Sequence, residues 1–407
     1  MIYVVIGASA SGINGARTLR KLEPDADIIL ISKDEYVYSR CILHHYISNK
    51  RNIDALNFSE KDYFKKYNIK WMRGIAVDKL KDEEHEIELS DGSRLSYDKL
   101  LVASGASSFI PPVENLRGAN NVVGLRNLED AQKIKDAAKK VKNVVVLGAG
   151  LIGIDAITGL LGYGLNISVV EMNDRILAVQ LDKYAAGRYE DLFRENGVNL
   201  KLGVKAEKLL VDEANNPKEL LLNTGEIIPC EFVVVSAGVR ANTAFLQGSN
   251  VKFDKFGLII DERGKTNIGD VYGAGDVTGR NPIWPTAVKE GIVAASNMAG
   301  KKLLMTDFFG SKNTMNFLGL ASMSLGNVSA LDESYKEEIE TKDGNYKKVI
   351  HKDGIIYGAI IQGDLSYAGI LTQLIRRKIN ISAVKKSIFE IDYSDFFNIK
   401  ENLEYTF

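Results

Sequence analysis

The chain has 407 residues, and its 52 Lys and Arg nearly balance its 53 Asp and Glu, leaving a formal net charge of -1. This length predicts two to four domains at about 100–200 residues each, and the balanced charge offers no broad attraction for nucleic acid or anionic lipid. Apolar stretches such as Val144–Leu147 are far shorter than the roughly 20 residues of a membrane helix. We therefore expect no nucleic-acid partner and no membrane association.

Two cysteines are too few for a disulfide scaffold or for a zinc or iron–sulfur site made of four thiolates, so we expect no metal site. The first apolar run, Ile2–Ile6, already reads as a buried strand, and no charged leader precedes it. We therefore expect a cytoplasmic protein.

Two segments share one plan, in which an apolar strand leads through a glycine turn and a helix to a second apolar strand. The first runs from Ile2–Ile6 through Gly7–Gly12 and a helix ending at Leu22 to Ile28–Ile31. The second runs from Val144–Leu147 through Gly148–Gly153 and a helix ending at Leu161 to Ile167–Glu171. Glycines at these places permit a tight turn, a close approach to a pyrophosphate and helix packing on the strand. The pattern predicts an α/β protein with two Rossmann-like dinucleotide-binding domains.

The first fingerprint departs from the usual pattern at two places. Ser9 replaces the middle glycine, and Ser32, followed by Lys33, stands where an acidic residue normally binds the ribose. The residues expected to bind the first dinucleotide are Gly7, Ser9, Ala10, Ser11, Gly12, Ser32 and Lys33.

The second fingerprint keeps all three glycines, and its second strand ends in Glu171. A carboxylate there accepts a hydrogen bond from a free 2′-hydroxyl and repels a 2′-phosphate, so we expect NADH rather than NADPH. Arg175 lies close enough in sequence to weaken that preference. The residues expected to bind this dinucleotide are Gly148, Gly150, Leu151, Ile152, Gly153, Glu171 and Arg175.

The remaining segments predict how these units are connected. Residues 86–103 read as a small hairpin that returns to the first sheet, Pro111-Pro112 marks a crossing between domains, and residues 126–140 form an amphipathic helix. Beyond about residue 307 the pattern changes to strands at 349–351 and 355–361 and a helix at 368–378, which predicts a C-terminal α+β domain. We expect domains at 1–111 with 244–306, at 112–243 and at 307–407.

Two tandem dinucleotide folds indicate hydride transfer between a nicotinamide and a flavin. The residues resemble the FAD-dependent pyridine nucleotide-disulfide oxidoreductase family, in the branch of NADH oxidases, coenzyme A disulfide reductases, NADH:rubredoxin reductases and nitrite reductase flavoproteins. Four markers carry the resemblance in order: the two fingerprints, the segment Ala103-Ser104-Gly105 between them, and Thr266–Asp276 after them.

The resemblance implies an EC 1 oxidoreductase with FAD in the first domain and NADH in the inserted one. It implies that Asp276, after Gly275, contacts the ribityl or pyrophosphate region, and that Gly238 belongs to the cofactor site. Asp155 occupies a place near the nicotinamide where the family usually has Glu, and the resemblance therefore implies a catalytic role for it. Trp284 lies in a segment that approaches the flavin in relatives, and a role as a core anchor is an equal alternative.

Cys41, in Tyr38–Ile47, carries the main alternative. The second half of that segment resembles the single-Cys pattern of coenzyme A disulfide reductases, and its first half resembles the Tyr-Ser-Arg of rubredoxin and nitrite reductase flavoproteins. Beside Arg40, which we expect at the cofactor, a catalytic thiol would have a lowered pKa. The other interpretation is a small apolar residue, as we expect for Cys230.

The adjacent His44 and His45 should point apart, and we expect them to pack as polar residues near the flavin or to lie at the surface. We also expect Tyr367, in the last domain, as a candidate counterpart of the partner tyrosines of the coenzyme A branch.

The resulting hypothesis is an FAD-dependent NADH:acceptor oxidoreductase whose partner is a rubredoxin- or ferredoxin-like redox protein or a larger redox complex. The alternative is a single-Cys coenzyme A disulfide or persulfide reductase, or an NADH oxidase, that uses Cys41. An inert nucleotide-binding subunit is a third alternative, and a homodimer stays open.

Overall fold

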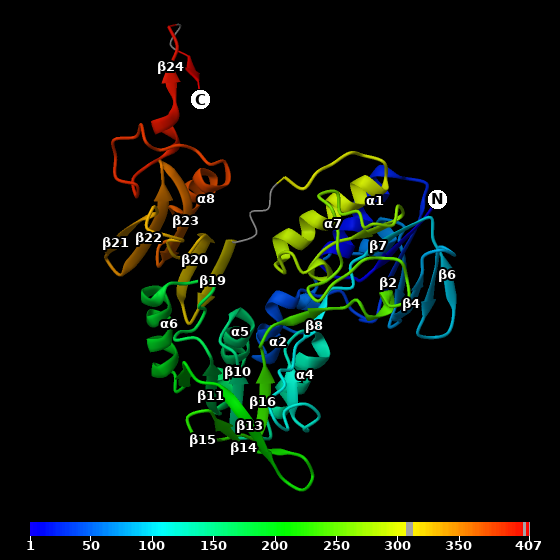
Figure 1. Cartoon of the computed structure of the whole chain (residues 1–407), viewed down its shortest axis with the longest axis horizontal. Coiled ribbons are helices and arrows are strands. Elements are labelled where there is room, and N and C mark those ends of the chain that lie inside the picture. Colours follow the sequence, from blue (N-terminus) through cyan, green and yellow to red (C-terminus); the bar gives the residue numbers. More distant parts are fainter. Residues whose placement is uncertain (307–311, 402–403, 407) are drawn as a thin grey trace.

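The computed structural model describes residues 1–306, 312–401 and 404–406. Three five-stranded sheets organise this part of the chain (Figure 1). The first two sheets are wholly parallel, as the two fingerprints predict, and the third is antiparallel. The prediction of an α/β fold with two Rossmann-like units and a C-terminal α+β unit is confirmed.

The first sheet places the first fingerprint strand at its centre. Its strands, in spatial order, are β18 (Val271–Gly273), β7 (Lys99–Val102), β1 (Ile2–Ile6), β2 (Asp27–Ser32) and β3 (Lys70–Arg73). Alternate residues of β1 face opposite sides, because successive side chains of a strand point in opposite directions. Tyr3 and Val5 pack with helices α1 (Ala10–Leu22) and α7 (Trp284–Met298).

The opposite face of this sheet is covered by a small antiparallel sheet. Val4 and Ile6 pack there against Leu80 and Ile87. The covering strands are β4 (Val77–Lys81), β5 (Glu86–Leu89) and β6 (Arg94–Ser96). The predicted hairpin at 86–103 therefore forms as β5 and β6 and then returns to the parallel sheet as β7.

The second sheet repeats the plan around the second fingerprint. Its order is β12 (Asn199–Leu202), β11 (Asn166–Glu171), β10 (Asn143–Leu147), β16 (Phe232–Val235) and β9 (Val122–Gly124). The helices that pack with it are α2 (Leu43–Ile47), α4 (Leu128–Ala137), α5 (Leu151–Leu160) and α6 (Lys183–Glu195). Strands β13 (Ala206–Val211), β14 (Pro217–Leu222) and β15 (Ile227–Pro229) cover the other face, and Cys230 is buried there, as expected for a structural residue.

The chain crosses between the two units twice, and the crossings pair with each other. Strand β8 (Ala106–Ser108) leaves the first unit, and the antiparallel strand β17 (Val239–Ala241) returns to it. The ladder lies just before the predicted crossing at Pro111-Pro112. The paired crossings hold the carboxyl ends of both parallel sheets near one another.

The third sheet docks on α6 of the second unit (Figure 1). Its order is β19 (Lys312–Phe317), β20 (Leu320–Gly326), β23 (Ile355–Gln362), β22 (Asn345–Lys352) and β21 (Lys336–Lys342). The Tyr189 hydroxyl donates to the Leu320 carbonyl at 2.6 Å, and the Gln362 amide donates to the Ala185 carbonyl at 3.0 Å. These bonds fix the C-terminal sheet on α6, the helix that follows β11.

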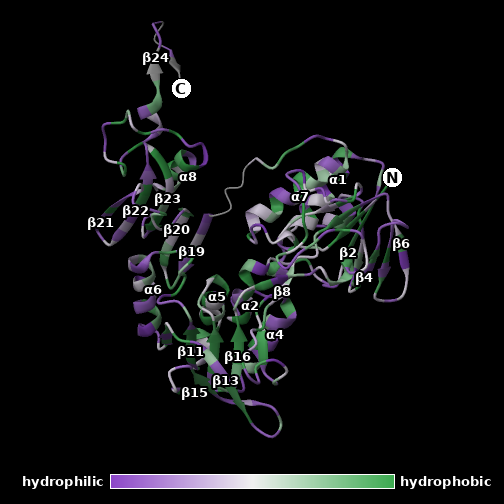
Figure 2. Cartoon of the chain, viewed as in Figure 1, coloured by the Kyte–Doolittle hydropathy of each residue, from purple (hydrophilic) through white to green (hydrophobic). Residues whose placement is uncertain are grey.

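The remaining elements are short or cover the third sheet. Helix α8 (Ala368–Arg376) packs on β20 and β23, and α3 (Tyr63–Lys66), β24 (Asn398–Ile399) and β25 (Tyr405–Thr406) complete the elements. Figure 2 shows hydrophobic colour concentrated on the central strands and hydrophilic colour on α6 and β21. In the part of the chain described, no helix is both long and apolar enough to cross a bilayer.

Boundaries differ from the predicted ones mainly at helix ends. The helix predicted at 126–140 is α4, which begins after a capping box made by Asn127 and Asp130 and ends at Ala137. The strands predicted at 349–351 and 355–361 are the longer β22 and β23, and the helix predicted at 368–378 is α8, which ends at Arg376. The domain boundaries stay predictions, and the predicted limits at 307 and 407 lie outside the described residues.

The contact between α1 and α7 gives a test of the packing. A Cβ added at Gly291 would overlap the Ser11 carbonyl oxygen, whereas one added at Gly162 would meet nothing within 4 Å. We expect Gly291→Ala to lower the free energy of unfolding by about 1–3 kcal/mol, measured by urea titration of the holoprotein. The control Gly162→Ala should leave it unchanged or slightly higher, and equal effects of the two variants would contradict the packing argument.

Candidate functional site

A cleft of about 1370 Å³ opens where the carboxyl ends of the strands of the first sheet meet the second unit. This exceeds the roughly 300–1,000 Å³ of a usual small-molecule site. Residues from both fingerprint turns line it, together with the crossing strands, β19 and the start of α7. In parallel α/β sheets, ligands bind outside the carboxyl ends of the strands, so this cleft is the candidate site.

Most of the predicted site residues lie in this cleft. Its lining includes Gly7, Ser9, Ala10, Ser11, Ser32, Lys33, Arg40, Cys41, Ala103, Ser104, Gly105, Leu151, Ile152, Asp155, Gly238, Asp276 and Trp284. The predicted residues outside the lining are Gly12, Gly148, Gly150, Gly153, Glu171, Arg175 and Gly275. The cofactor roles of both groups of residues stay predictions.

The first fingerprint turn has the geometry that a pyrophosphate requires. Gly7 has a φ of 111°, and a Cβ added there would overlap the Ala103 carbonyl oxygen. The turn therefore passes directly from β1 into α1. The Ser9 side chain makes no capping hydrogen bond with that helix, so the N–H groups of its first turn remain available to an anion in the cleft. The turn fits the phosphates of FAD despite the replacement of the middle glycine.

Ser32 has a different environment from the expected ribose site. The residue is buried, its hydroxyl donates to the Asp34 carbonyl at 2.7 Å, and it accepts from the Trp71 indole N–H at 3.0 Å. Both contacts tie the hydroxyl to the protein. The neighbouring Lys33 also lines the cleft, at the end of β2.

Arg40 belongs to an ion-pair network and does not act on Cys41. Its guanidinium donates to the Asp34 carboxylate at 2.7 Å and to the Tyr38 hydroxyl at 3.1 Å. The expectation that Arg40 lowers the pKa of Cys41 is wrong, because these contacts engage its charge and Arg126 is the cation whose charge acts on the thiol.

Arg126 joins the two nucleotide units across the cleft. Its guanidinium forms an ion pair with Asp276 and donates to the Ala106 carbonyl at 3.0 Å, while its own carbonyl accepts from Arg40 at 2.8 Å. Arg126 lies just before α4 in the second unit, and Asp276 lies just after β18 in the first. The pair places a fixed dipole where the resemblance implies the ribityl or pyrophosphate region of FAD.

The second fingerprint turn also fits a dinucleotide. Gly148 has a φ of 99°, and a Cβ there would lie 2.7 Å from the Ser236 carbonyl oxygen. A Cβ at Gly150, which caps α5, would enter open space. Glu171 follows at the end of β11 and accepts hydrogen bonds from the backbone N–H groups of Ala149 at 2.7 Å and Asn173 at 2.8 Å. These bonds fix the carboxylate beside the turn.

Arg175 is held by its own loop. Its guanidinium donates to the Leu181 carbonyl at 3.2 Å, to the Ala178 carbonyl at 3.2 Å and to the Asp174 carboxylate at 2.8 Å. A guanidinium with these three acceptors is already engaged, so a phosphate on the ribose would have to displace them.

Cys41 faces the cleft, but its thiol is not activated. The protein around the thiol removes it from water and so raises its pKa, and the negative charges of Asp276 and, above pH about 8, of Asp155 raise it further. The charge of Arg126 and a hydrogen bond from the Ser39 side chain act in the opposite direction without reversing the shift. The expected lowered pKa is therefore wrong, and the residue is a protonated thiol at neutral pH.

His44 and Asp155 meet on the wall of the cleft near Cys41. His44 Nδ1 lies 3.3 Å from Asp155 Oδ1, and the two side chains are 13% and 16% exposed. Burial raises the pKa of Asp155 to about 8 and lowers the pKa of His44 to about 4. The rings of His44 and His45 lie 4.1 Å apart, so the expectation that they point apart is wrong.

Two further residues bear on the first nucleotide site. Trp284 lines the cleft and also packs edge-on against Phe58, with 4.6 Å between ring centroids, and its approach to the flavin stays a prediction. Glu290 on α7 is 1% exposed and accepts from the Gly275 N–H at 2.6 Å. Burial raises the pKa of Glu290 to about 7.

Tyr367 has a structural role in the C-terminal unit. Its hydroxyl lies 2.9 Å from the Ile388 carbonyl and 2.8 Å from the Ile391 carbonyl. These contacts tie α8 to the segment that follows it.

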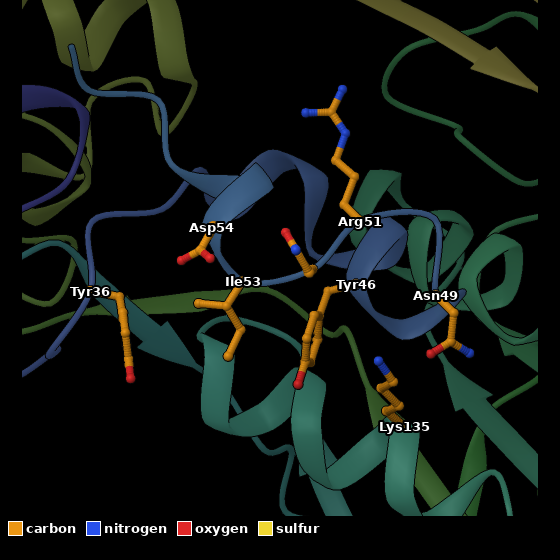
Figure 3. A pocket seen from close by; sticks show the side chains of 8 residues that line it. Tyr36, Tyr46, Asn49, Arg51, Ile53, Asp54 and Lys135 are labelled. Atoms are coloured by element: carbon orange, nitrogen blue, oxygen red, sulfur yellow. The ribbon is translucent and has the colours of Figure 1, made fainter. Parts of the chain in front are cut away.

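A second hollow, of about 480 Å³, lies beside α2 and α4 (Figure 3). The Lys135 ammonium lies 4.1 Å from the Tyr46 ring centroid, and Figure 3 shows the Arg51 side chain directed away from both. The two cations do not converge, so we assign no ligand to this hollow. Nor does any group of three or more His, Cys, Asp or Glu suited to a metal ion occur within residues 1–306, 312–401 and 404–406.

Sequence reasoning missed the partners that come from distant segments. Arg126 and Glu290 act at the Gly275-Asp276 turn, and Asn242 joins the two crossings by donating to the Ser104 carbonyl at 2.9 Å. No local motif marks these residues. Only the pairing of β8 with β17 and the packing of α7 on α1 bring them to the cleft.

The environment of Cys41 predicts slow alkylation at neutral pH. In the purified holoprotein, the rate with iodoacetamide should rise about tenfold per pH unit between pH 7 and 9, because only the thiolate reacts. Asp276→Asn should raise the rate at pH 8, since it removes a negative charge that opposes ionisation. Cys41→Ser should abolish labelling because Cys230 is buried, and a rate that levels off below pH 8 would contradict the raised pKa.

Comparison with known proteins agrees with this geometry. Residues 1–291 match the model of the pyridine nucleotide-disulphide oxidoreductase family, and residues 312–379 match that of the rubredoxin NAD+ reductase C-terminal domain. The epsilon subunit of NADH-dependent phenylglyoxylate dehydrogenase from Aromatoleum evansii is 29% identical over 94% of this chain and 93% of the relative. NADH-rubredoxin oxidoreductase from Clostridium acetobutylicum is 26% identical over 89% of this chain and 91% of the relative.

A solved structure of similar fold is the NAD-dependent persulfide reductase from A. fulgidus. Its TM-score is 0.84 at 25% identity, over 94% of this chain and 78% of that one. The match of the first family model extends over both fingerprints and the Thr266–Asp276 segment. The chain therefore belongs to the pyridine nucleotide-disulphide oxidoreductase family, whose members bind FAD and NAD(P)H, and it is an oxidoreductase.

Proposed function

We propose that the chain is an FAD-dependent NADH:acceptor oxidoreductase that passes electrons between NADH and a rubredoxin- or ferredoxin-like redox protein. In this proposal, residues 1–111 with 244–306 bind FAD, residues 112–243 bind NADH, and the C-terminal unit from 307 onward flanks the cleft. A bound flavin supplies the chemistry, because it exchanges hydride with nicotinamide and exchanges electrons singly or in pairs.

The feature that carries the proposal is a cysteine in the cleft whose surroundings raise the pKa of its thiol. A thiol enzyme needs a thiolate nucleophile, whereas loss of water around the thiol and two nearby carboxyl groups oppose ionisation of Cys41. Electron transfer to a redox protein needs no thiolate. The similarity to NADH-rubredoxin oxidoreductase and to a subunit of phenylglyoxylate dehydrogenase supports a protein acceptor, either a separate redox protein or another subunit.

The second candidate is a coenzyme A disulfide or persulfide reductase, or an NADH oxidase, that uses Cys41. The observation that favours it is the exposure of Cys41 to the cleft, where a substrate has access to the sulfur. The similarity to the persulfide reductase from A. fulgidus gives further support. This function requires ionisation of the thiol during turnover.

An anaerobic NADH titration followed by visible absorbance separates the two candidates. We expect the flavin absorbance to bleach after about one NADH equivalent per FAD, without a long-wavelength charge-transfer band, because Cys41 stays protonated. Cys41→Ser should give the same titration. Uptake beyond one equivalent, with a charge-transfer band that Cys41→Ser abolishes, would favour the thiol enzyme instead.

The proposed preference for NADH depends on Glu171. Its carboxylate is fixed beside the glycine turn, and Arg175, the nearby cation, is engaged by its own loop. We expect Glu171→Ala to reduce the ratio of kcat/KM for NADH over NADPH by about 10- to 100-fold, since a hydrogen bond to a charged group contributes about 1.5–3 kcal/mol.

Glu171→Gln is the matched control for this test, because it keeps the side-chain size and an oxygen for the Ala149 N–H but removes the charge. Its nucleotide ratio should fall between those of the wild type and Glu171→Ala. An unchanged ratio in both variants would contradict the assignment of Glu171.

A further inference from the structure

The wall of the cleft beside Cys41 carries a pair of ionisable groups that the proposed function does not use. His44 lies on α2 and Asp155 on α5, and both line the cleft. The sequence offers no local signal for their contact. They meet because α2 and α5 pack closely: a Cβ added at Gly159, one helical turn after Asp155, would lie 3.1 Å from the His44 carbonyl oxygen.

The contact leaves each group with the other as its acid–base partner. His44 Nδ1 is buried and makes no hydrogen bond of good geometry with another described residue, and it lies 3.3 Å from Asp155 Oδ1. A neutral imidazole whose Nδ1 accepts a proton carries its own proton on Nε2. The arrangement matches a protonated carboxyl that faces an acceptor nitrogen.

We propose that His44 and Asp155 form one acid–base pair that exchanges a proton between the reacting end of the cleft and solvent. The inference rests on the proposed function, because it assigns the proton traffic of that reaction. Oxidation of NADH yields NAD+, one proton and two electrons. When two single-electron acceptors remove the electrons, one proton must leave the cleft.

The same pair is needed if the acceptor is a disulfide. In that case NADH and one proton from solvent convert the disulfide to two thiols, so that one proton enters the cleft per NADH. The direction of proton movement changes, but one proton crosses in both reactions. Cys41 is a poor carrier because its thiol is hard to ionise, which leaves the neighbouring pair as the acid–base group.

The charges around the pair agree with an uncharged resting state. His45, against the His44 ring, and Lys50 both disfavour a proton on His44, and burial acts in the same direction. Asp276 and Arg126 neutralise each other by their ion pair. Asp155 is protonated below pH about 8, and His44 is neutral above pH about 4, so the pair holds one acidic proton between these limits.

The first test measures the proton directly and does not depend on turnover. Infrared difference spectra of the holoprotein, wild type minus Asp155→Asn, should contain the carbonyl stretch of a protonated carboxyl at pH 6 and lose it with a midpoint near pH 8. His44→Gln should shift this band by altering the group that faces the acid. Glu290 is another buried acid with a raised pKa, and Glu290→Gln shows which carbonyl band, if any, belongs to it.

The second test uses the reaction. In single-turnover reduction by NADH with ferricyanide as the electron acceptor, a pH-indicator dye should report about one proton released per NADH by the wild type. Asp155→Asn and His44→Gln should each slow this release about 100- to 10,000-fold, and the double variant should be no slower than the single ones. Asp155→Glu should restore part of the rate, because it retains a carboxyl.

The outcomes separate this inference from the proposed function. An absent Asp155 band at pH 6, a band unaffected by His44→Gln, or unchanged proton release in Asp155→Asn would overturn the pair. A wild type that NADH does not reduce would overturn the proposed function, and the infrared band would still report whether the pair exists.

Discussion

The close approach of a glycine to the carbonyl of a neighbouring strand is the constraint on which both nucleotide sites depend. Gly7 lies against Ala103, and Gly148 lies against Ser236, so that neither position has room for a Cβ. Because of this contact, each turn leads directly from its strand into a helix whose first N–H groups point outward. Each fingerprint strand is central in its sheet. The two crossings of the chain pair as β8 and β17 and hold the two units together. The N-termini of α1 and α5 therefore lie in adjoining units.

The sequence predicted those parts of the site that local patterns determine. Both fingerprints and the placement of Glu171 at the end of β11 follow from strand, glycine and helix signals within about thirty residues. The cofactor role of Ser32 stays a prediction, and its hydroxyl accepts a hydrogen bond from Trp71, a residue of the adjacent strand β3. The pairing of β3 with β2 is a property of the sheet, and no pattern around Ser32 indicates it.

Cys41 illustrates the difference between neighbours in sequence and neighbours in space. Arg40 precedes it, which suggested a stabilised thiolate, but the guanidinium is turned to Asp34 and Tyr38. The charges that act on the thiol instead come from Asp155, Asp276 and Arg126, in three other parts of the chain. The sequence alone does not show that these three residues lie near the Cys41 thiol, because their positions depend on how the second unit packs against the first.

The cleft has charged walls and an uncharged pair of side chains, and burial of that pair causes the difference. Lys33, Arg40 and the Arg126–Asp276 pair bring charge to the nucleotide-binding walls. The His44–Asp155 pair beside Cys41 is uncharged at pH 7, because burial keeps Asp155 protonated and His44 neutral. If the nicotinamide binds beside Asp155, as the resemblance implies, an ionised Asp155 would attract the positive charge of an oxidised nicotinamide and so favour NAD+ over NADH in the cleft. The protonated carboxyl removes that bias, so the same wall can receive the nicotinamide in either redox state.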